Sequence, residues 1–402
     1  MQSAVSNRKY LFVKSKRSKV REATMKKNRL MAVAMAGAVV MSMMACGSST
    51  VPDSESTKAA KETAAATEAG KDEAKETKAA ADTSDVSNAS NIAPEIPEGA
   101  TVIKLGTTVN EQDSFQIAAV KFAELVQENT NGAYAIEIHP NGDLGGERDM
   151  LESMQMGTLD MGIVTSGPFV NFSQDMGVLD MPYLFANKEQ AYAVFDGEVG
   201  RELLDTLEGS GLKGLAYAER GFRNLTNNVR PIEKAEDLKG LKIRVMENEV
   251  YQKAFEALQV NATPMAWADC LTALQQGTVD GEENPINVIN SYKLWESQKY
   301  VTLDGHSYST AIITMSLDKF NSLDADTQKV FLDAAQEAAE YERAWVADQE
   351  AGQLQAMKDN GMEIVENPDV ESFKEAVKSV YDAYPQYDEY VKKINDVIAA
   401  VG

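Results

Sequence analysis

The alternation of strand-like and helix-like segments that begins near residue 99 constrains the fold of this chain more than any other feature. Thr101–Val109 and Ala133–His139 have the alternating pattern of strands, and Ser114–Gln127 between them carries apolar residues at helical spacing. Strands that alternate with helices are typical of α/β layers around a mainly parallel sheet. Over the roughly 300 residues that follow, this pattern predicts two α/β lobes.

The same alternation continues to the C-terminus. The longest helical stretch, Asp324–Met357, is almost uninterrupted and rich in Ala, Glu and Gln, which are good helix formers. Another helix is expected to follow Gly145-Gly146 and to end at about Met156. Further strands are expected at 159–164, 212–217, 241–245 and 300–302, and further helices at 187–208, 247–258, 268–276 and 368–401.

The N-terminus has the organisation of a secretion signal. Residues 1–45 contain ten Lys or Arg and one acid, and they end in an apolar run from Leu30 to Ala45. This run is shorter than the ~20 residues that span a bilayer, and a small residue precedes Cys46, as at a cleavage site. We expect Met25 to be the natural start and Cys46 to carry lipid, because M-M-A-C resembles a bacterial lipobox. The alternative is an ordinary signal peptide in which Cys46 is incidental.

Residues 46–98 are expected to form a linker. After Cys46 this segment contains no aromatic residue and consists largely of Ala, Thr, Ser, Lys and Glu, so it has too little apolar surface for a core. We therefore expect a disordered tether that ends at Pro94 and Pro97. A coil of this length would let the folded part reach membrane partners without being fixed to them.

Composition excludes several kinds of partner. The chain has 62 acidic and 39 basic residues, a net charge of −23, whereas a phosphate backbone requires a basic face. The cysteines at 46 and 270 do not make a disulfide framework, and His139 and His306 lack neighbours at metal-ligand spacing. The sequence therefore predicts no nucleic-acid partner, no metal and no cofactor. We expect Cys270 to be a small buried apolar residue and both histidines to be structural.

The string at 209–214 matches G-x-G-x-x-G, the pattern of dinucleotide-binding turns. A true fingerprint follows a strand and opens a helix, whereas here a helix comes before and a strand after. The string therefore predicts a helix C-cap and a turn.

Two arginines, Arg223 and Arg244, stand near predicted strand ends. An arginine fork binds a carboxylate through two parallel N–H groups, and ligands of α/β lobes bind beyond the carboxyl ends of strands. Spacing alone nevertheless favours structural salt bridges for both. The strings that surround them are H-P-N-G-D-L-G-G-E-R-D at 139–149, G-F-R-N-L-T-N at 221–227, L-K-I-R-V-M-E-N at 241–248, T-P-M-A-W at 263–267 and L-Q-Q-G-T-V-D-G-E-E-N-P at 274–285.

Together with G-T-L-D-M-G-I-V-T-S-G-P and L-D-M-P-Y-L-F, these strings resemble the extracytoplasmic solute-binding proteins of TRAP (tripartite ATP-independent) transporters, the dicarboxylate-binding DctP family. The similarity runs from about Ile103 to about Val380. It implies an α/β, two-lobed periplasmic-binding-protein-like fold with crossing hinge strands and one long helix spanning both lobes, for which Asp324–Met357 is the candidate. The expected lobes are 99–221 plus 310–349, and 222–309 plus 350–402.

The resemblance also implies ligand-binding roles for single positions. Arg244 matches the family arginine that holds the ligand carboxylate by a salt bridge. Arg223 matches a second arginine near that carboxylate, and Asn284 matches an asparagine that hydrogen-bonds it. Glu147 and Thr165 match positions on the wall of the other lobe that touch hydroxyls or more distal ligand groups. No catalytic residue is implied.

Some positions depart from the family pattern. Trp267 replaces a common phenylalanine, which enlarges the apolar wall, while Glu282 replaces a usual glutamine and Glu249 a usual proline. Glu247 and Asn248 follow the family arginine closely enough to contact the ligand. An unpaired glutamate at 247 would repel a second carboxylate, so the sequence favours a hydroxylated sugar acid over a plain dicarboxylate.

The resemblance implies a protein that captures a small organic acid, of the sugar-acid or C4-dicarboxylate type. It would deliver this ligand to the integral membrane subunits of an ion-gradient-driven TRAP transporter. We expect an extracytoplasmic monomer, lipid-anchored to the outer face of the cytoplasmic membrane. Two alternatives stay open: a secreted hydrolase or lyase with Glu147 or Glu247 as general base, and a domain that presents ligand to a sensor.

Overall fold

The computed structural model describes Val86 and residues 89–401. The expected signal segment 1–45, the start at Met25, the lipidated Cys46 and most of the linker lie outside these residues, so what is expected of them stays a prediction. Within the described part of the chain, no helix is both long enough and apolar enough to cross a membrane.

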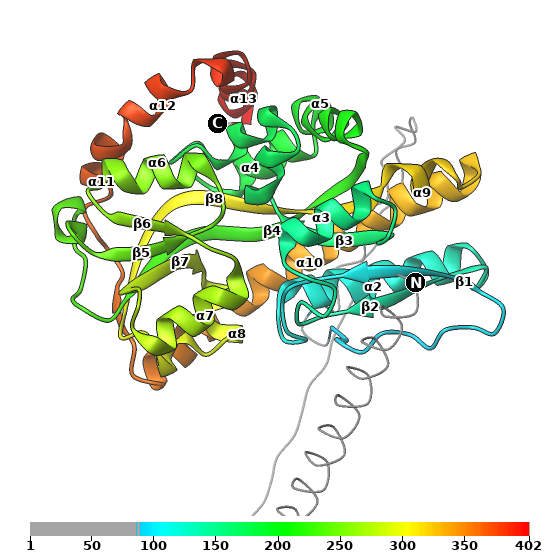
Figure 1. Ribbon diagram of the computed structural model, residues 1–402, viewed down its shortest axis with the longest axis horizontal. Coiled ribbons are helices and arrows are strands. Elements are labelled where there is room, and N and C mark those ends of the chain that lie inside the picture. Colours follow the sequence, from blue (N-terminus) through cyan, green and yellow to red (C-terminus); the bar gives the residue numbers. More distant parts are fainter. Residues whose placement is uncertain (1–85, 87–88, 402) are drawn as a thin grey trace, which may run out of the picture. The chain divides into compact units, whose positions relative to one another are not determined.

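The strands of the described residues belong to one nine-stranded sheet (Figure 1). They are β1 (Thr101–Gly106), β2 (Tyr134–His139), β3 (Met161–Thr165), β4 (Leu212–Asn227), β5 (Lys242–Val245), β6 (Asn261–Pro264), β7 (Gly281–Pro285), β8 (Tyr300–Ser316) and β9 (Glu363–Val365). Their order is β2-β1-β3-β8-β4-β7-β5-β6, and β9 pairs with β8. β1 pairs in parallel with β2 and β3, and β5 with β6 and β7, as the βαβ alternation predicts.

Two long antiparallel strands, β4 and β8, join the two ends of this sheet. Strands are expected from the sequence only at 212–217 and 300–302, but the structure continues them to Asn227 and Ser316. The predicted ends are too early because charged residues such as Glu219 interrupt the apolar pattern. Glu219 is nevertheless buried and is ion-paired with a lysine distant in sequence. The sheet is consequently mixed and not mainly parallel.

Each half of the β4–β8 pair belongs to a different lobe. The first half of β4 pairs with the second half of β8, beside β3, and its second half pairs with the first half of β8, beside β7. The ladder shifts register between Glu219 and Gly221 and again between Arg223 and Leu225, and Gly221 has a φ of +103° that only glycine adopts readily. These irregularities lie where the strands cross, and the predicted two-lobed fold with crossing strands is confirmed.

The predicted helices are present, but two of them are broken. The stretch 187–208 divides at Asp196 and Gly197, and 368–401 divides at Lys378 and again at Tyr384. The second of these breaks arises because Pro385 disfavours helical backbone at the preceding residue. The helices are α2 (Ser114–Asn129), α3 (Glu147–Gln155), α4 (Lys188–Phe195), α5 (Glu198–Thr206), α6 (Glu249–Ala257), α7 (Trp267–Gln276), α8 (Ile286–Ser291), α9 (Leu317–Asn321), α10 (Ala325–Asp359), α11 (Val370–Val377), α12 (Ser379–Ala383) and α13 (Asp388–Val401).

The longest helix, α10, packs against elements of both lobes (Figure 1). Asp324 caps its N-terminus by accepting a hydrogen bond from the Thr327 backbone N–H. The first half buries Phe331 and several alanines against α2, and the second half buries Met357 in a separate core with side chains of α7 and α8. The prediction of one long helix that spans both lobes is therefore confirmed.

Two smaller expectations also hold. Gly211 ends a 3-10 turn at Leu207–Ser210 in the left-handed conformation, with a φ of +78°, and β4 begins at the next residue. The G-x-G-x-x-G string is thus a cap and turn. Cys270 is fully buried among the apolar side chains of α7 and α8, as a small hydrophobic residue would be.

Candidate functional site

A cavity of about 300 Å³ lies where the two expected lobes meet. The loop after β2 and the start of α3 form one wall, and the end of β5 with the turn between β6 and α7 forms the other. Asn171 donates a hydrogen bond across the rim to the Glu247 carbonyl oxygen at 3.3 Å. The polar and aromatic side chains of the lining are Thr108, Asn141, Glu147, Asp149, Arg244, Glu247, Trp267 and Asp269.

Arg244 supplies a positive charge to this cavity. It lies in β5 and is only 4% exposed. Its Nε and Nη2 donate to the Met265 carbonyl oxygen at 3.0 and 2.8 Å, which fixes the plane of the guanidinium. No carboxylate of the described residues forms an ion pair with Arg244. Because a buried charge without a counter-charge is unfavourable, the cavity is suited to an anion.

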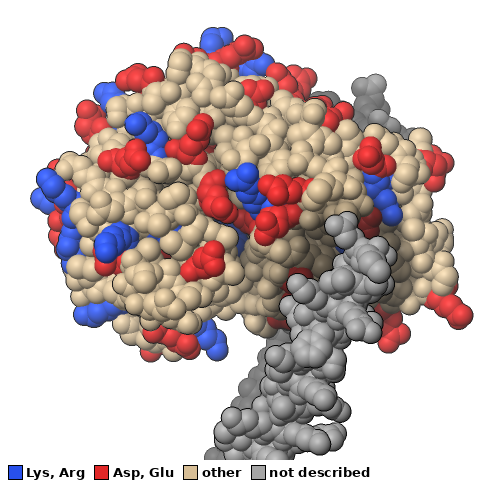
Figure 2. Space-filling view, in the orientation of Figure 1, with Lys and Arg blue, Asp and Glu red and all other residues tan. Residues whose placement is uncertain are grey.

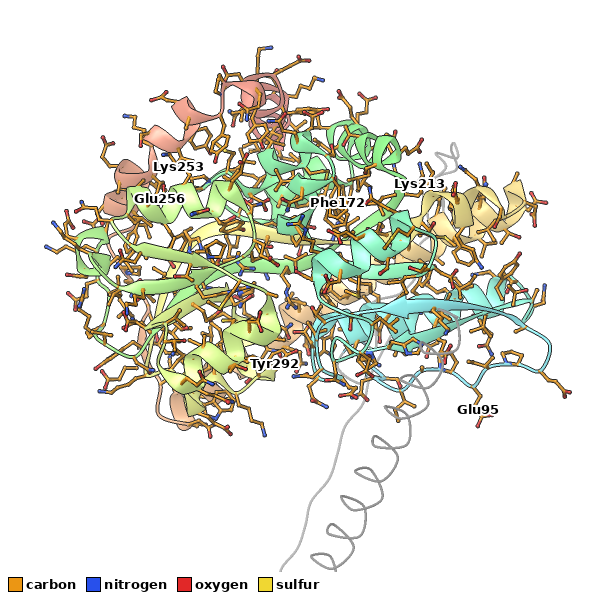
Figure 3. The ribbon with its side chains drawn as sticks, viewed as in Figure 1. Glu95, Phe172, Lys213, Lys253, Glu256 and Tyr292 are labelled. Atoms are coloured by element: carbon orange, nitrogen blue, oxygen red, sulfur yellow. The ribbon has the colours of Figure 1, made fainter. Side chains whose placement is uncertain are left out.

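Trp267 and Tyr292 support Arg244 from the same wall. The guanidinium carbon lies 5.6 Å from the centre of the Trp267 ring, and the Tyr292 ring meets that indole edge-on at 5.0 Å. The Tyr292 hydroxyl donates to the Thr108 carbonyl oxygen of the opposite wall at 3.2 Å (Tyr292 is labelled in Figure 3). These contacts orient Arg244 and connect the two walls.

Glu147 faces the cavity from the opposite wall, at the start of α3. Thr165, at the end of β3, donates to Glu147 Oε1 through its backbone N–H at 2.9 Å and through its hydroxyl at 2.6 Å. Both bonds end on one oxygen, and Oε2 has no hydrogen-bond partner among the described residues. Thr165 therefore orients Glu147, and Oε2 is available to a donor inside the cavity.

The lining of the cavity is acidic on both walls. Four acids line the cavity, namely Glu147, Asp149, Glu247 and Asp269. Among the described lining residues, Arg244 is the one basic side chain. Asp149 is partly used within α3, because it accepts a hydrogen bond from a backbone N–H at the start of that helix. Carboxylates accept hydrogen bonds and do not donate them, so the lining away from Arg244 suits hydroxyl donors and repels anionic groups.

Arg223 does not line the cavity and lies in a neutralised cluster. Its Nη2 donates to Glu283 Oε1 at 2.9 Å and to Asn284 Oδ1 at 3.1 Å, and its Nε also donates to Glu283. His306 contacts Glu283 at 3.2 Å and Asp304 at 2.9 Å. Burial alone would raise the pKa of Glu283, but Arg223 and His306 outweigh it and lower that pKa to about 2. The charge of Arg223 is thus compensated within the protein.

Asn248 has structural partners on both lobes. Its Oδ1 accepts hydrogen bonds from two backbone N–H groups at the start of α6, and its Nδ2 donates to the Gly167 carbonyl oxygen and to Asp180 Oδ2, each at 2.8 Å. Burial raises the pKa of Asp180 to about 7. Because both Nδ2 hydrogens are used, Asn248 joins the lobes and caps a helix.

The cavity brings together half of the side chains predicted to bind a ligand, namely Arg244, Glu147, Trp267 and Glu247. The other half have protein partners and do not line it, namely Thr165, Arg223, Asn284 and Asn248. Direct ligand contact by any of these eight residues stays a prediction.

Sequence reasoning missed Glu283, Tyr292 and Asp269. A signal for Glu283 was present, because two adjacent acids in a buried strand require a cation nearby. Tyr292 and Asp269 gave no such signal, since their positions depend on contacts between segments far apart in the sequence.

No cluster of three His, Cys, Asp or Glu side chains that could hold a metal ion occurs in residue 86 or residues 89–401. Figure 2 shows Lys and Arg side chains scattered among Asp and Glu on the visible face, without a continuous basic surface. The absence of a metal, a cofactor and a nucleic-acid partner stays a prediction from composition.

Comparisons with known proteins all find similarity to one family. The family of bacterial extracellular solute-binding proteins, family 7 (DctP), matches residues 105–387. A solute-binding protein of Verminephrobacter eiseniae is 40% identical over 280 residues, which cover 70% of this chain and 84% of that protein. The 2,3-diketo-L-gulonate-binding periplasmic protein of Escherichia coli is 36% identical over 303 residues, which cover 74% of this chain and 92% of that protein.

A solved structure gives the same result. The TRAP periplasmic solute-binding protein of Polaromonas sp. JS666, bound to D-erythronate, is 40% identical to this chain and superimposes with a TM-score of 0.72. The match covers 74% of this chain and 98% of that protein.

Proposed function

The chain belongs to the bacterial extracellular solute-binding proteins of family 7, and we propose that its ligand is a sugar acid with one carboxylate. Membership makes it a binding protein and not an enzyme, which excludes the alternative of a hydrolase or lyase. Proteins of this family act outside the cytoplasm together with the membrane components of TRAP transporters.

The uncompensated guanidinium of Arg244 is the observation that carries this proposal. The Met265 carbonyl oxygen occupies the Nε–H and one Nη2–H, so the Nη1–Nη2 edge keeps two parallel N–H groups. A ligand carboxylate fits this edge with two hydrogen bonds and supplies the missing negative charge. Trp267 closes one face of the guanidinium, which keeps the fork aimed into the cavity.

The acidic lining supports a hydroxylated ligand over a dicarboxylate. Glu147 Oε2, Glu247 and Asp269 can each accept a hydrogen bond from a ligand hydroxyl. A second ligand carboxylate would face these acids without a basic partner in the described lining. Two similar proteins fit this class, because one is named for 2,3-diketo-L-gulonate and the other was solved with D-erythronate.

Asn284 and Arg223 act together at the carboxylate end. Arg223 fixes the Asn284 carbonyl oxygen, and Glu282 accepts one Nδ2 hydrogen. Because Asn284 does not line the cavity, the predicted bond from its second Nδ2 hydrogen to the ligand carboxylate requires the walls to move. Thr165 contributes by orienting Glu147, and Asn248 by holding the lobes together beside Asp180.

Ligand binding draws the two lobes together. The bonds from Asn171 to Glu247 and from Tyr292 to Thr108 already cross between the walls, and a ligand that contacts both walls favours the closed form. Small-angle scattering should therefore give a smaller radius of gyration at saturating ligand, and superimposable curves would contradict closure. We assign 99–221 plus 310–349 to one lobe and 222–309 plus 350–402 to the other. The last helix, α13, belongs to the second lobe in this division but packs against α4 and α5 of the first lobe.

Attachment to the membrane is the part of the proposal that depends on Cys46. After removal of residues 1–45, the thioether-linked lipid on Cys46 would anchor a monomer to the outer face of the cytoplasmic membrane through the linker 46–98. Cys46→Ser should abolish labelling by a palmitate analogue and leave the protein in the medium or as precursor. Persistent labelling of Cys46→Ser would show that the lipid is attached elsewhere.

A ligand screen by thermal shift tests the ligand class. D-erythronate, D-galactonate, D-glucuronate and succinate should be compared on the wild type and on Arg244→Ala. A ligand at 100 times its Kd stabilises the folded state by about 2.7 kcal/mol, so a bound sugar acid is readily detected. We expect stabilisation by at least one sugar acid and none in Arg244→Ala. Equal or stronger stabilisation by succinate would contradict the preference for a single carboxylate.

A further inference from the structure

Glu282 lies on the same face of the sheet as Arg244. The parallel register pairs Ile243 with Gly281, so the residues that follow them, Arg244 and Glu282, project to the same side. Glu282 is fully buried, and no basic side chain of the described residues forms an ion pair with it. A buried acid without a counter-ion therefore neighbours the proposed carboxylate site.

The hydrogen-bond geometry around Glu282 favours its protonated form. Gln298 Nε2 donates to the Ser297 carbonyl oxygen at 2.9 Å, which leaves Gln298 Oε1 facing the Thr226 hydroxyl at 3.0 Å. An amide oxygen only accepts, so it takes the single hydrogen of Thr226 Oγ1. Thr226 Oγ1 also lies 3.1 Å from Glu282 Oε1 and 3.4 Å from the Glu282 carbonyl oxygen. With the Thr226 hydrogen on Gln298, the shorter contact is a hydrogen bond when Glu282 supplies the hydrogen.

The second oxygen of Glu282 positions Asn284. Glu282 Oε2 accepts a hydrogen bond from Asn284 Nδ2, while Asn284 Oδ1 accepts one from Arg223 at 3.1 Å. Both ends of the amide are thus fixed. A neutral Glu282, with one oxygen donating and the other accepting, satisfies all of these contacts at once.

Burial favours the neutral form. It raises the pKa of Glu282 to about 7, and the adjacent Glu283 adds to this rise, whereas Arg244, the bond from Asn284 and Arg223 oppose it. The thiol of Cys270 stays neutral at ordinary pH, because burial raises its pKa to about 12, and α8 carries no titratable side chain. The charged and titratable groups that act on Glu282 from β4, β5, β7 and α7 are Arg223, Arg244, Glu283 and Cys270.

We propose that Glu282 must carry a proton for the cavity to hold its anionic ligand, so that ligand affinity is coupled to the protonation of this residue. The inference rests on the proposed function, because it takes Arg244 as the anchor of the ligand carboxylate. An ionised Glu282 would place a second negative charge beside Arg244 and would repel the incoming anion. The protonated form leaves the charge of Arg244 to the ligand and keeps Asn284 in place.

The expected signature is a loss of affinity as the pH rises above 7. If only the protonated form binds, the apparent Kd equals the intrinsic Kd divided by the protonated fraction, so it rises about tenfold when the pH is one unit above the pKa. The probe is whichever of D-erythronate, D-galactonate and D-glucuronate binds at pH 6. Its carboxyl group stays ionised from pH 5.5 to 8.5, because α-carboxyl groups titrate near pH 3.5.

Titration calorimetry over this range measures the change in Kd and the proton that accompanies binding. In two buffers of different ionisation enthalpy, the wild type at pH 8 should take up about one proton per ligand bound. This measurement requires no variant, so it tests the inference even if a substitution impairs folding.

Glu282→Gln tests the residue itself. Its amide reproduces the neutral acid, because Nε2 can donate to Thr226 and Oε1 can accept from Asn284. We expect this variant to bind like the wild type at pH 6 and to keep that affinity at pH 8.5. A matched control removes another buried acid, Glu342, whose pKa burial raises to about 8. Glu342→Gln should retain the wild-type pH dependence.

The possible outcomes separate this inference from the proposed function. A wild-type Kd that is constant from pH 5.5 to 8.5, or a pH dependence that survives in Glu282→Gln, would overturn the role of Glu282 and leave the proposed function intact. Weak binding by a folded Glu282→Gln at pH 6 would also overturn it. If none of the three sugar acids binds the wild type at pH 6, the proposed function itself is wrong.

Discussion

Two arginines of the segment 222–309 have similar burial and opposite surroundings. Arg223 is 1% exposed and Arg244 is 4% exposed. Arg223 is bonded to the carboxylate of Glu283, which in turn contacts His306, so its charge is compensated. Arg244 donates only to a carbonyl oxygen, and its remaining N–H groups face a cavity.

The difference separates a charge that stabilises the fold from a charge that binds a ligand. A compensated buried ion pair needs no counter-charge from a ligand, and removing one partner leaves a less compensated charge in the protein interior. An uncompensated arginine lowers the stability of the empty protein and recovers that loss when an anion binds. The two residues should therefore respond oppositely to substitution, in stability for one and in affinity for the other.

The largest effect is expected in the stability of Arg223 variants. Arg223→Ala removes the arginine partner of the buried Glu283 and leaves it only His306, which Glu283 shares with Asp304, so the free energy of unfolding should fall by about 3–5 kcal/mol. Denaturant unfolding at pH 7 measures this loss. The double variant Arg223→Met with Glu283→Leu removes both charges and should recover part of it. If Arg223→Ala is as stable as the wild type, Arg223 is not the structural charge of this comparison.

Arg244 should show the converse behaviour. Arg244→Ala removes the proposed ligand partner, which typically costs 2–5 kcal/mol, or roughly 30- to several-thousand-fold in Kd. Its unfolding free energy should not fall far below that of the wild type, because the loss of the bonds to Met265 is offset by removal of an uncompensated buried charge. Arg148→Ala is a matched control, since Arg148 pairs with Glu152 at the surface and does not line the cavity. Calorimetry with the sugar acid found by screening measures both variants.

Arg244→Lys sharpens this test. Lysine keeps the charge but lacks the planar pair of donors, so most of the affinity should still be lost. Near-normal affinity in Arg244→Lys would show that charge alone anchors the ligand and that the fork is unnecessary.

The two arginines also show what the sequence alone does not predict, namely which of them forms an ion pair within the protein. Both stand in family motifs near strand ends, and the sequence alone favoured a structural salt bridge for each. That interpretation is correct for Arg223 and incorrect for Arg244, which has no ion pair among the described residues. The partner of Arg223 is sixty residues away, and spacing does not reveal such a pairing.

The fold was more accessible to sequence reasoning than the site. Alternating patterns located β1, β2, α2 and the long helix α10, because these elements are defined by local apolar periodicity. The extent of β4 and β8 was missed, since Glu219 and His306 look like strand breakers until their buried partners are known. Residues that act through others, such as Thr165 on Glu147, are likewise visible only in three dimensions.

The cluster around Arg223 should also give stability a pH dependence. Burial opposes protonation of His306, but Asp304 and Glu283 outweigh it and raise its pKa from 6.5 to about 9. A raised pKa stabilises the folded state fully below pH 6.5, and this contribution is lost as the pH rises through 9. His306→Gln should therefore lose more stability at pH 6 than at pH 9.5, by roughly 3 kcal/mol at most. Denaturant unfolding of both proteins at each pH measures it, and an equal loss would contradict the assignment.

The smallest effect is expected at Thr165, which reaches the cavity only through Glu147. Thr165→Val keeps the shape of the side chain and the backbone bond at 2.9 Å, but it removes the hydroxyl bond to Glu147 Oε1. Hydrogen bonds to charged groups contribute about 1.5–3 kcal/mol, and loss of part of this ordering should weaken sugar-acid binding by roughly tenfold. Thr165→Ser retains the hydroxyl and should bind like the wild type. Equal affinities for the valine and serine variants would show that Glu147 is oriented without Thr165, or that Glu147 does not touch the ligand.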